Sequence, residues 1–285
     1  MKVAQALLCL TLYSLFSPAE SHSADSIQVR QNDSVKVAET KTLSQDSRFY
    51  RYDSSFVWID SRDFSEAMSD ITGSYVFRFN NGGRNSIYFN GISDKETGIF
   101  RDGVQINDVY FGGFDVQSHT VNDIERIEEI SAVSSFIYGS SPASKSFNII
   151  TKDKIHRKPF SQFRYSQDRF NSLYADVFFS LPLARQINFL AGITKHSIDG
   201  RYGNSEFDVW NGRSRLSYVP SDKLSFRADF YYNNISRGLN EGLDTAQSTA
   251  DLTDEDATVR NPYSNEEIEQ FNFGLTACSK LFGKS

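Results

Sequence analysis

The side chains that most often carry out chemistry in proteins are scattered in this sequence. The four histidines show no ligand-pair spacing, and we interpret all but the first as surface or loop residues: His22, His119, His156 and His196. The chain has neither the Gly-x-Ser-x-Gly turn of serine hydrolases nor a phosphate-binding P-loop. These patterns predict no catalytic residues, no metal site and no cofactor.

Two charged groups have a spacing that could support a site. Residues 251–256 include an acidic Asp-Glu-Asp cluster, which could bind a cation but is more typical of a solvated loop. Arg126 and Glu128 lie two positions apart and could form a buried ion pair inside a domain. The two cysteines, Cys9 and Cys278, are too few for a disulfide framework. Cys9 lacks the small preceding residue of a lipidation site, and we expect Cys278 to be unpaired.

The composition indicates a β-rich protein. The formal net charge is -6, which argues against a nucleic-acid-binding protein, because such proteins usually carry a basic patch. Aromatic residues make up 14% of the chain, with 24 Phe and 14 Tyr, and they occur without long apolar runs. This combination suits β-strands, and aromatic girdles are a feature of membrane β-barrels.

Residues 1–24 are predicted to be an export signal. Lys2 supplies the positive charge, and the apolar run that follows has the length of a signal segment and is too short for a transmembrane helix. A small-residue stretch that begins at Ser17 offers cleavage after Ser21, Ser23 or Ala24. The alternative is a buried N-terminal helix, which the abrupt end at Pro18 disfavours. Elsewhere no apolar run is long enough to span a membrane as a helix, so the exported protein is expected to be soluble or a β-barrel.

Residues 25–55 are polar, show little periodicity, and are interpreted as a mobile leader. Within this leader, residues 33–38 alternate polar and apolar side chains. Such a segment could add as an edge strand to a partner's sheet. An ordinary linker explains the same residues equally well.

Residues 56–155 are predicted to be a small α+β domain. Asp63 is a plausible cap of a short helix over 63–68. Strand patterns follow at four places, and the run at 98–106 is broken by the tight Asp102-Gly103 turn. The predicted strands cover 75–79, 86–92, 98–106 and 147–151, and a short helical turn leads into a strand within 121–130.

Residues 156–285 alternate apolar and polar side chains in about six segments, so that each strand has one apolar face. Short turns at 182–185 and 220–223 alternate with longer polar loops near 197–206 and 236–265. Membrane barrels have short turns on the periplasmic side and long loops outside. The strand patterns cover 173–181, 187–193, 224–232 and 271–277, with weaker versions around 163–165 and 210–218.

A soluble β-sandwich also alternates, and it is the main competing fold. The aromatic residues of these segments point to one side, and the polar set on the other side includes Arg227 and Asp229. A sandwich core would not readily bury those charges. The pattern therefore favours antiparallel strands of a transmembrane β-barrel.

Several motifs, in order along the chain, resemble the plug domain of TonB-dependent outer-membrane receptors. The run 101–107 is similar to the Asp-Gly-Val turn of that family, and the end of the plug is matched by 124–128, 134–135, 138–139 and 148–152. A signal, a leader, a plug and then alternating strands is the order of the family. The resemblance implies a structural plug motif made by Asp102, Gly103, Arg126, Glu128, Tyr138, Gly139 and Asn148. It also implies that the TonB-contacting box is Ser34, Val35, Lys36, Val37 and Ala38.

The chain departs from the family pattern in its loops and its length. Residues 131–133 replace the usual Arg-Gly-Pro, and glycines expected near Ser141, Ser144 and Lys145 are absent, so the loop there is expected to be rebuilt. Transporter barrels of this class have about 22 strands. About six are predicted before Ser285, and we therefore expect a fragment or the product of a truncated gene.

The resemblance implies a receptor in the outer membrane of a two-membrane bacterium. Such a receptor would bind an unidentified small-molecule ligand, such as an iron chelate or a cobalamin, and import it with energy supplied through TonB. Its partners would be TonB and outer-membrane lipid, without nucleic acid or a cofactor. The alternatives are a non-transporting interaction protein of the outer membrane or periplasm, or a non-functional truncated remnant. A secreted hydrolase would need a nucleophile and a base that the sequence does not offer.

Overall fold

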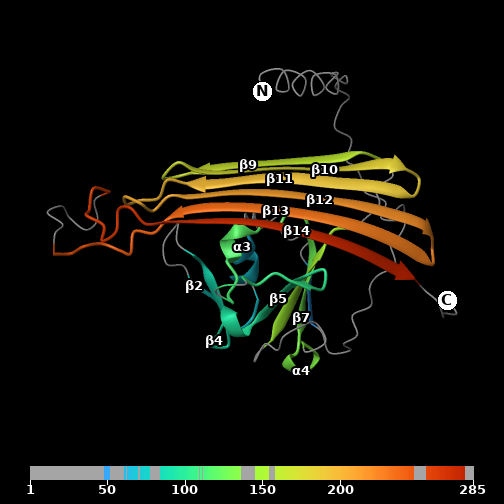
Figure 1. Cartoon of the computed structure of the whole chain (residues 1–285), viewed down its shortest axis with the longest axis horizontal. Coiled ribbons are helices and arrows are strands. Elements are labelled where there is room, and N and C mark those ends of the chain that lie inside the picture. The colour runs from blue at the N-terminus through green and yellow to red at the C-terminus, as the bar shows by residue number, and fades with distance from the viewer. Residues whose placement is uncertain are drawn as a thin grey trace, which may run out of the picture. The chain divides into compact units, whose positions relative to one another are not determined.

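The computed structural model describes residues 48–51, 61, 63–69, 71–77, 84–108, 110, 112–135, 145–153, 158–246 and 255–279 of the chain. All of them belong to the compact unit that begins at Ser34. They form three β-sheets with a few short helices (Figure 1). This confirms the predicted fold class, an α+β domain followed by antiparallel strands. We call the described residues of 48–153 the plug, and the six strands within 160–279 the strand sheet.

The plug contains two small sheets. The larger has the order β1-β7-β8-β5-β6, and β5 and β8 are its parallel pair. The smaller has the order β2-β3-β4. The first sheet comprises β1 (Arg48–Arg51), β5 (Gly98–Arg101), β6 (Val104–Gln105), β7 (Ile124–Ile130) and β8 (Ser146–Thr151). The second comprises β2 (Ser74–Phe77), β3 (Ser86–Phe89) and β4 (Ile92–Ser93). The helical segments are α3 (Phe64–Ser69), α4 (Ala132–Ser135), and the 3-10 turns η1 (Asp94–Glu96) and η2 (Val116–Ser118).

Local sequence explains where these elements begin and end. Asp63 caps α3, as predicted, because its carboxylate accepts from the backbone N–H groups of Ser65 at 2.9 Å and Glu66 at 3.2 Å. The prediction of one strand over 86–92 is wrong. Asn90 and Gly91 have φ angles of 48° and 82°, and they reverse the chain between β3 and β4. Asn-Gly favours such tight turns because both residues tolerate positive φ.

One apolar core holds the plug together. Phe89 of β3 stacks on Phe147 of β8 with ring centroids 4.1 Å apart, which joins the two small sheets. The helix α3 covers this core with the buried face that includes Phe64 and Met68. The buried core residues are Phe64, Ala67, Met68, Ile71, Ile87, Phe89, Ile99, Phe114, Val116, Val121, Ile124, Ile127, Phe147 and Ile149.

The strand sheet has six antiparallel strands in sequence order, as predicted. The turns after β10 and β12 leave only 185–186 and 222–223 between strands, whereas the connections after β11 and β13 span 199–206 and 239–264. The predicted alternation of short turns and long loops is therefore confirmed for these four connections, whereas the connection after β9 is short and spans 169–171. The strands are β9 (Phe160–Asp168), β10 (Ser172–Ala184), β11 (Ile187–Ile198), β12 (Phe207–Ser221), β13 (Leu224–Gly238) and β14 (Asn265–Ser279).

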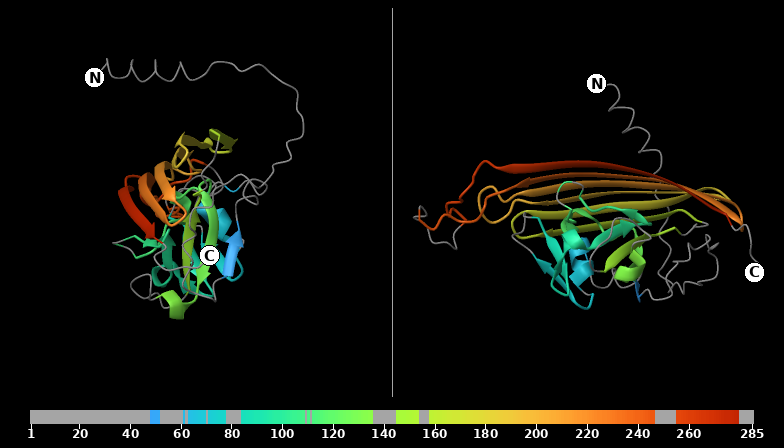
Figure 2. Two further views of the ribbon diagram at one scale, coloured as in Figure 1. Left: turned by 90° about the vertical axis from the view of Figure 1, so that its right-hand side faces the viewer. Right: turned by 60° about the horizontal axis from the view of Figure 1, so that its bottom comes forward.

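Figure 2 shows the plug against one face of the strand sheet, which we call the inner face. Buried polar and charged side chains line this inner face, and exposed apolar side chains line the outer face. Because side chains alternate along a strand, each strand contributes to both faces. Buried arginines on the inner face, such as Arg213 and Arg237, are untypical of a sandwich core, so the predicted barrel-type strands are favoured over a sandwich. Exposed apolar side chains of the outer face are Phe163, Tyr165, Val177, Phe179, Leu181, Leu183, Ile193, Trp210, Leu216, Tyr218, Phe226, Phe271, Phe273 and Leu275.

The stacking of Phe89 on Phe147 predicts a large effect of truncation. We expect Phe89→Ala to lower the free energy of unfolding of the plug by about 3–5 kcal/mol, because the cavity lies where two sheets meet. Urea unfolding of the purified chain in detergent, followed by circular dichroism, measures this change. The matched control is Tyr75→Ala on the neighbouring strand β2, because Tyr75 is 64% exposed. Equal losses in the two variants would contradict the assignment of Phe89 to the core.

Candidate functional site

Asp102 lies in the tight turn between β5 and β6. Asp102 and Gly103 have φ angles of 49° and 86°, a region that glycine and aspartate enter at less cost than most residues. The Gly103 N–H donates to Asn148 Oδ1 at 3.0 Å. The Asp102 carboxylate accepts from the N–H of Thr151 at 3.2 Å and from its hydroxyl at 2.6 Å. These bonds tie the turn to β8 and hold Asp102 within reach of the strand sheet.

Arg215 of β12 connects this turn to the strand sheet. Its Nη2 lies 2.6 Å from Asp102 Oδ2, and its Nε lies 2.5 Å from Asp229 Oδ1 on β13. Arg227, also on β13, lies 2.9 Å from Asp229 and 3.9 Å from Asp153. The predicted inward orientation of Arg227 and Asp229 is confirmed, since both belong to this network.

A second cluster of charges lies beside the first. Arg101 of the plug pairs with Asp123, which precedes β7. Arg213 of β12 places its Nε 3.8 Å from Asp123 and its Nη2 2.6 Å from Asp176 on β10. Arg213 and Asp176 are buried, so their mutual pairing compensates the cost of removing both from water.

A third pair lies toward the end of the sheet that carries the long loops. Arg237 of β13 pairs with Asp115, which caps η2, and its Nε lies 3.1 Å from Glu266 of β14. Its guanidinium also lies 5.3 Å from the ring centroid of Phe207, a cation–π contact. Arg237 is fully buried, and the two carboxylates provide the opposite charge that such burial requires.

Two tyrosines of the strand sheet add uncharged contacts to the plug. Tyr231 Oη lies 2.6 Å from His119 Nδ1 and also accepts from the Asn211 amide. The His119 ring stacks between Phe114 and Tyr231, with centroids 4.7 Å and 5.4 Å away.

Tyr174 of β10 contacts the same segment of the plug. Its hydroxyl lies 3.1 Å from Thr120 Oγ1 and accepts from the Asn122 amide at 2.9 Å. Arg164 of β9 also donates to Asn122. Thr120 and Asn122, which precede β7, are therefore held by two strands of the sheet.

The charge network shifts the pKa values of the plug's titratable groups. Burial alone would raise the pKa of Asp102, but Arg215 and Arg227 hold it below its ordinary value. Burial would also raise the pKa of Asp123, but Arg101 and Arg213 hold it below its ordinary value. Burial, together with the nearby Arg101, lowers the pKa of His119 to about 3. At neutral pH the two carboxylates are therefore ionised and His119 is uncharged.

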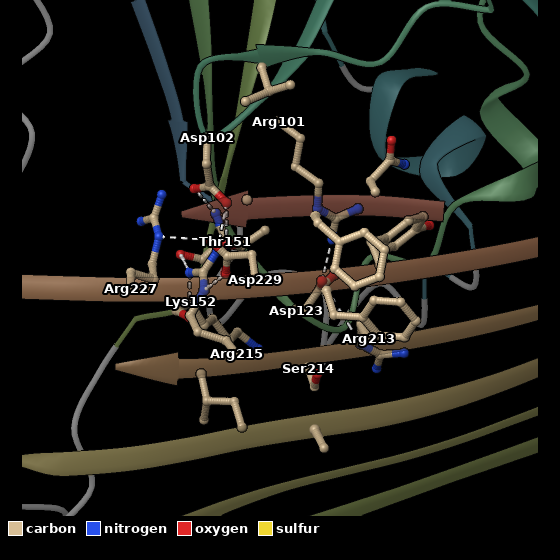
Figure 3. A pocket seen from close by; sticks show the side chains of 18 of the residues that line it. Arg101, Asp102, Asp123, Thr151, Lys152, Arg213, Ser214, Arg215, Arg227 and Asp229 are labelled. Carbon is tan, nitrogen blue, oxygen red and sulfur yellow. Dashed lines mark hydrogen bonds and ion pairs between the residues drawn. The ribbon is translucent and has the colours of Figure 1, made fainter. Parts of the chain in front are cut away.

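A pocket between the plug and the strand sheet encloses about 880 Å³, part of it open to solvent (Figure 3). Its charged lining residues point toward one another across the interface. Among the described residues, no three metal-binding side chains gather at one point. What this arrangement can do is hold the plug against the strand sheet by charge. The charged residues that line the pocket are Arg101, Asp102, Asp123, Lys152, Arg213, Arg215, Arg227 and Asp229.

Most of the motif residues predicted from sequence lie together in the plug. Arg126 and Glu128 form the expected ion pair at 3.0 Å, and Glu128 is buried. Asn148 donates to Glu128 at 3.2 Å and accepts from Gly103, so it links β7, β8 and the turn. Tyr138, Gly139, the box at 34–38 and the predicted signal at 1–24 lie outside the described residues.

The prediction that His119 and His196 are surface or loop residues is wrong. Both are buried, His119 against Tyr231 and His196 on the inner face of β11. An isolated histidine gives no periodic signal, so its burial follows only from the packing of distant segments. His156 lies outside the described residues, and Cys278 is a free thiol, as expected.

The sequence interpretation also missed the plug carboxylates Asp115 and Asp123 and the sheet arginines Arg213 and Arg215. One signal could have found the arginines. They occupy alternate positions of one strand, between outward residues such as Leu216, and so share the polar face of that strand. No comparable local pattern marks the carboxylates.

The lowered pKa of His119 predicts a pH dependence of stability. The unfolded chain binds a proton at this residue below about pH 6.5, and the folded chain does so only near pH 3. As the pH falls from about 6.5, the free energy of unfolding should therefore decrease by about 1.4 kcal/mol per pH unit. We expect His119→Asn, measured by urea unfolding between pH 7 and 4, to remove this part of the slope. The control is Tyr231→Phe, which should lower stability without changing the slope, and an unchanged slope in His119→Asn would contradict the assignment.

Comparison with known proteins gives this geometry its context. Residues 59–145 match the family described as TonB-dependent Receptor Plug Domain. FpvA of P. aeruginosa, solved with heterologous pyoverdines, superposes with a TM-score of 0.65 at 13% identity, covering 84% of this chain and 32% of FpvA. The siderophore receptor PirA from Acinetobacter baumannii gives 0.60 at 17% identity, with 82% and 37% covered. The copper transporter OprC gives 0.58 at 12% identity, with 76% and 32% covered.

This chain thus spans about a third of the length of these solved proteins. The likeness includes both the plug and the strands that follow it, since it extends over most of the present chain. Residues 59–145 are therefore a plug domain of the TonB-dependent receptor family, and the six strands that follow have the fold of solved receptors of that family.

Proposed function

We propose that this chain forms part of an outer-membrane receptor that binds a small-molecule ligand and imports it with energy supplied through TonB. The observation that carries the proposal is the pairing of a plug domain with the inner face of a sheet whose outer face is apolar. An iron chelate or a cobalamin is the ligand class that we propose. Support comes from the solved proteins of the same fold, which include siderophore receptors and a copper transporter.

The outer face of the strand sheet supports a place in the lipid bilayer. Aromatic pairs cross neighbouring strands there, such as Phe230 with Phe273 at 5.0 Å and Tyr232 with Phe271 at 4.9 Å. Apolar, aromatic-rich outer faces are what barrel strands present to lipid. Among the described residues, no helix is long and apolar enough to cross a bilayer. We propose that residues 1–24 direct export to this membrane.

The small sheet of the plug offers a surface for the ligand. Figure 1 shows β2 and β4 closer than β7 to the end of the strand sheet where β13 ends and β14 begins. Tyr75 and Phe77 on β2 are 64% and 43% exposed, and Phe77 meets Tyr88 of β3 edge-on at 6.5 Å. Exposed aromatic rings provide contact area with little conformational entropy to lose, which favours binding of a rigid chelate.

The leader would connect TonB to the plug. Residues 34–38 are the proposed box, and an extended segment of this kind can add as a strand to a partner's sheet. Ala38 lies ten positions before Arg48, where β1 begins. Because β1 pairs antiparallel with β7 at the edge of the plug sheet, a pull on the leader would act directly on the plug.

Strand addition by the box predicts that proline is not tolerated there. We expect Val35→Pro and Val37→Pro to abolish energised uptake while ligand binding at the cell surface is retained, because proline removes a backbone donor. Uptake and binding of a labelled iron chelate or cobalamin by whole cells separate the two effects. Thr40→Pro, just outside the box, is the control and should retain uptake. Normal uptake by both box variants would refute this role of residues 34–38.

The lipid-facing assignment makes a second prediction. Leu216 is an outward residue of β12, and we expect Leu216→Arg to lower the free energy of folding into lipid bilayers by about 2–4 kcal/mol. The control is Ser236→Arg, an outward position on β13 close to the long loop, which should cost much less. Folding into vesicles, monitored by urea titration, measures both. Similar costs at the two positions would contradict the proposed placement of the bilayer.

A further inference from the structure

Four arginines of the strand sheet each contact two carboxylates, one from the plug and one from the sheet itself. Arg215 lies 2.6 Å from Asp102 of the plug and 2.5 Å from Asp229 of its own sheet. Arg237 pairs with Asp115 of the plug and lies 3.1 Å from Glu266 of its own sheet. The other two are Arg213, between Asp123 and Asp176, and Arg227, between Asp153 and Asp229.

Three of the four plug carboxylates, Asp102, Asp115 and Asp123, also have contacts within the plug. Asp123 pairs with Arg101, and Asp102 accepts two hydrogen bonds from Thr151. Asp115 accepts from the backbone N–H of Gln117 at 3.2 Å. On each side of the interface, these charged groups therefore have an interaction partner that does not belong to the other side.

This double pairing changes the cost of moving the plug. Separating an ordinary buried ion pair is costly mainly because it leaves a charge without a partner in a poorly solvated place. Here the arginines would keep a carboxylate of their own sheet after separation. Asp123 would keep Arg101, and Asp102 and Asp115 would keep hydrogen-bond donors of the plug. The open pocket also lets water reach Asp229, whose side chain is 26% exposed.

We propose that this interface is built to separate, with Asp176, Asp229 and Glu266 neutralising the sheet arginines whenever the plug moves away. These three carboxylates stabilise the separated state more than the closed state. The inference rests on the proposed function in one respect, because import requires the plug to move. The test of the inference needs neither ligand nor TonB. If this test fails, the uptake experiments still decide the proposed function.

The proposal predicts opposite effects from two carboxylates that contact the same arginine. Asp102→Asn removes a partner that Arg215 has only in the closed state, so separation should become about tenfold more frequent. Asp229→Asn removes the partner that Arg215 and Arg227 keep after separation, so separation should become about tenfold less frequent. If the carboxylates only held the closed state together, both substitutions would increase separation.

A buried thiol reports the separation. In a Cys9→Ser, Cys278→Ser background, Val209→Cys places a small apolar thiol on the inner face of β12, where Val209 is 2% exposed. Its rate of reaction with a water-soluble maleimide, measured on the full chain in detergent at pH 7, follows the fraction of molecules whose plug has moved away. The control is Asp208→Asn, which removes a carboxylate from the Lys195 ion pair of the same sheet and should not change the rate.

A second pair of variants covers the case in which Asp229→Asn fails to fold. Asp115→Asn should raise the rate and Glu266→Gln should lower it, because they flank Arg237 as Asp102 and Asp229 flank Arg215. Circular dichroism and the heat-dependent mobility of the protein in gels check that each variant is folded. Faster labelling in the folded Asp229→Asn or Glu266→Gln variant, or unchanged labelling in all four variants, would overturn the proposal.

Discussion

The arrangement of this protein depends on the electrostatics of one buried surface, the inner face of the strand sheet. Arg213 and Arg237 project from that face and are almost fully removed from solvent. Charges in such a place require partners of opposite sign, since burial of an isolated ion is far more costly than any packing gain. The plug supplies part of that compensation through Asp102, Asp115 and Asp123. The turn that contains Asp102 and the cap formed by Asp115 place their carboxylates against the strand sheet.

The same constraint accounts for the contrast between the two faces of the strands. A strand that alternates side chains can place charge on one side and aromatic rings on the other without any change in backbone. In β12, for example, Arg213 and Arg215 point to the plug, while Leu216 and Tyr218 point outward. Register fixes this division for the whole sheet, because a slip by one residue would place arginines among the outward aromatic rings.

The parts of the fold that were predictable from sequence are those determined by neighbours in the chain. The runs at 173–181, 187–193 and 224–232 show a period of two, which a strand alone produces, and the cap at Asp63 needs only the next three residues. The turn at Asn90 was missed because Ile87, Phe89 and Ile92 continue the apolar pattern across it. Long-range pairing was the other limit. Asp102 and Arg215 are 113 residues apart, and nothing in the neighbourhood of either one identifies its partner. Burial of His119 depends in the same way on Tyr231, 112 residues away.

The distribution of acids and bases between the plug and the strand sheet constrains recombination of the gene. In each of the four ion pairs that join the two parts within the described ranges, the acid belongs to the plug and the base belongs to the strand sheet. A recombination event that replaced the plug alone would bring carboxylates to the right places only if the donor used the same polarity at the same positions. A plug from a donor gene with arginines at those positions would place like charges next to one another in a site with little water. The two halves of this gene should therefore be exchanged together, and substitutions at Asp102 and Arg215 should occur in the same lineages.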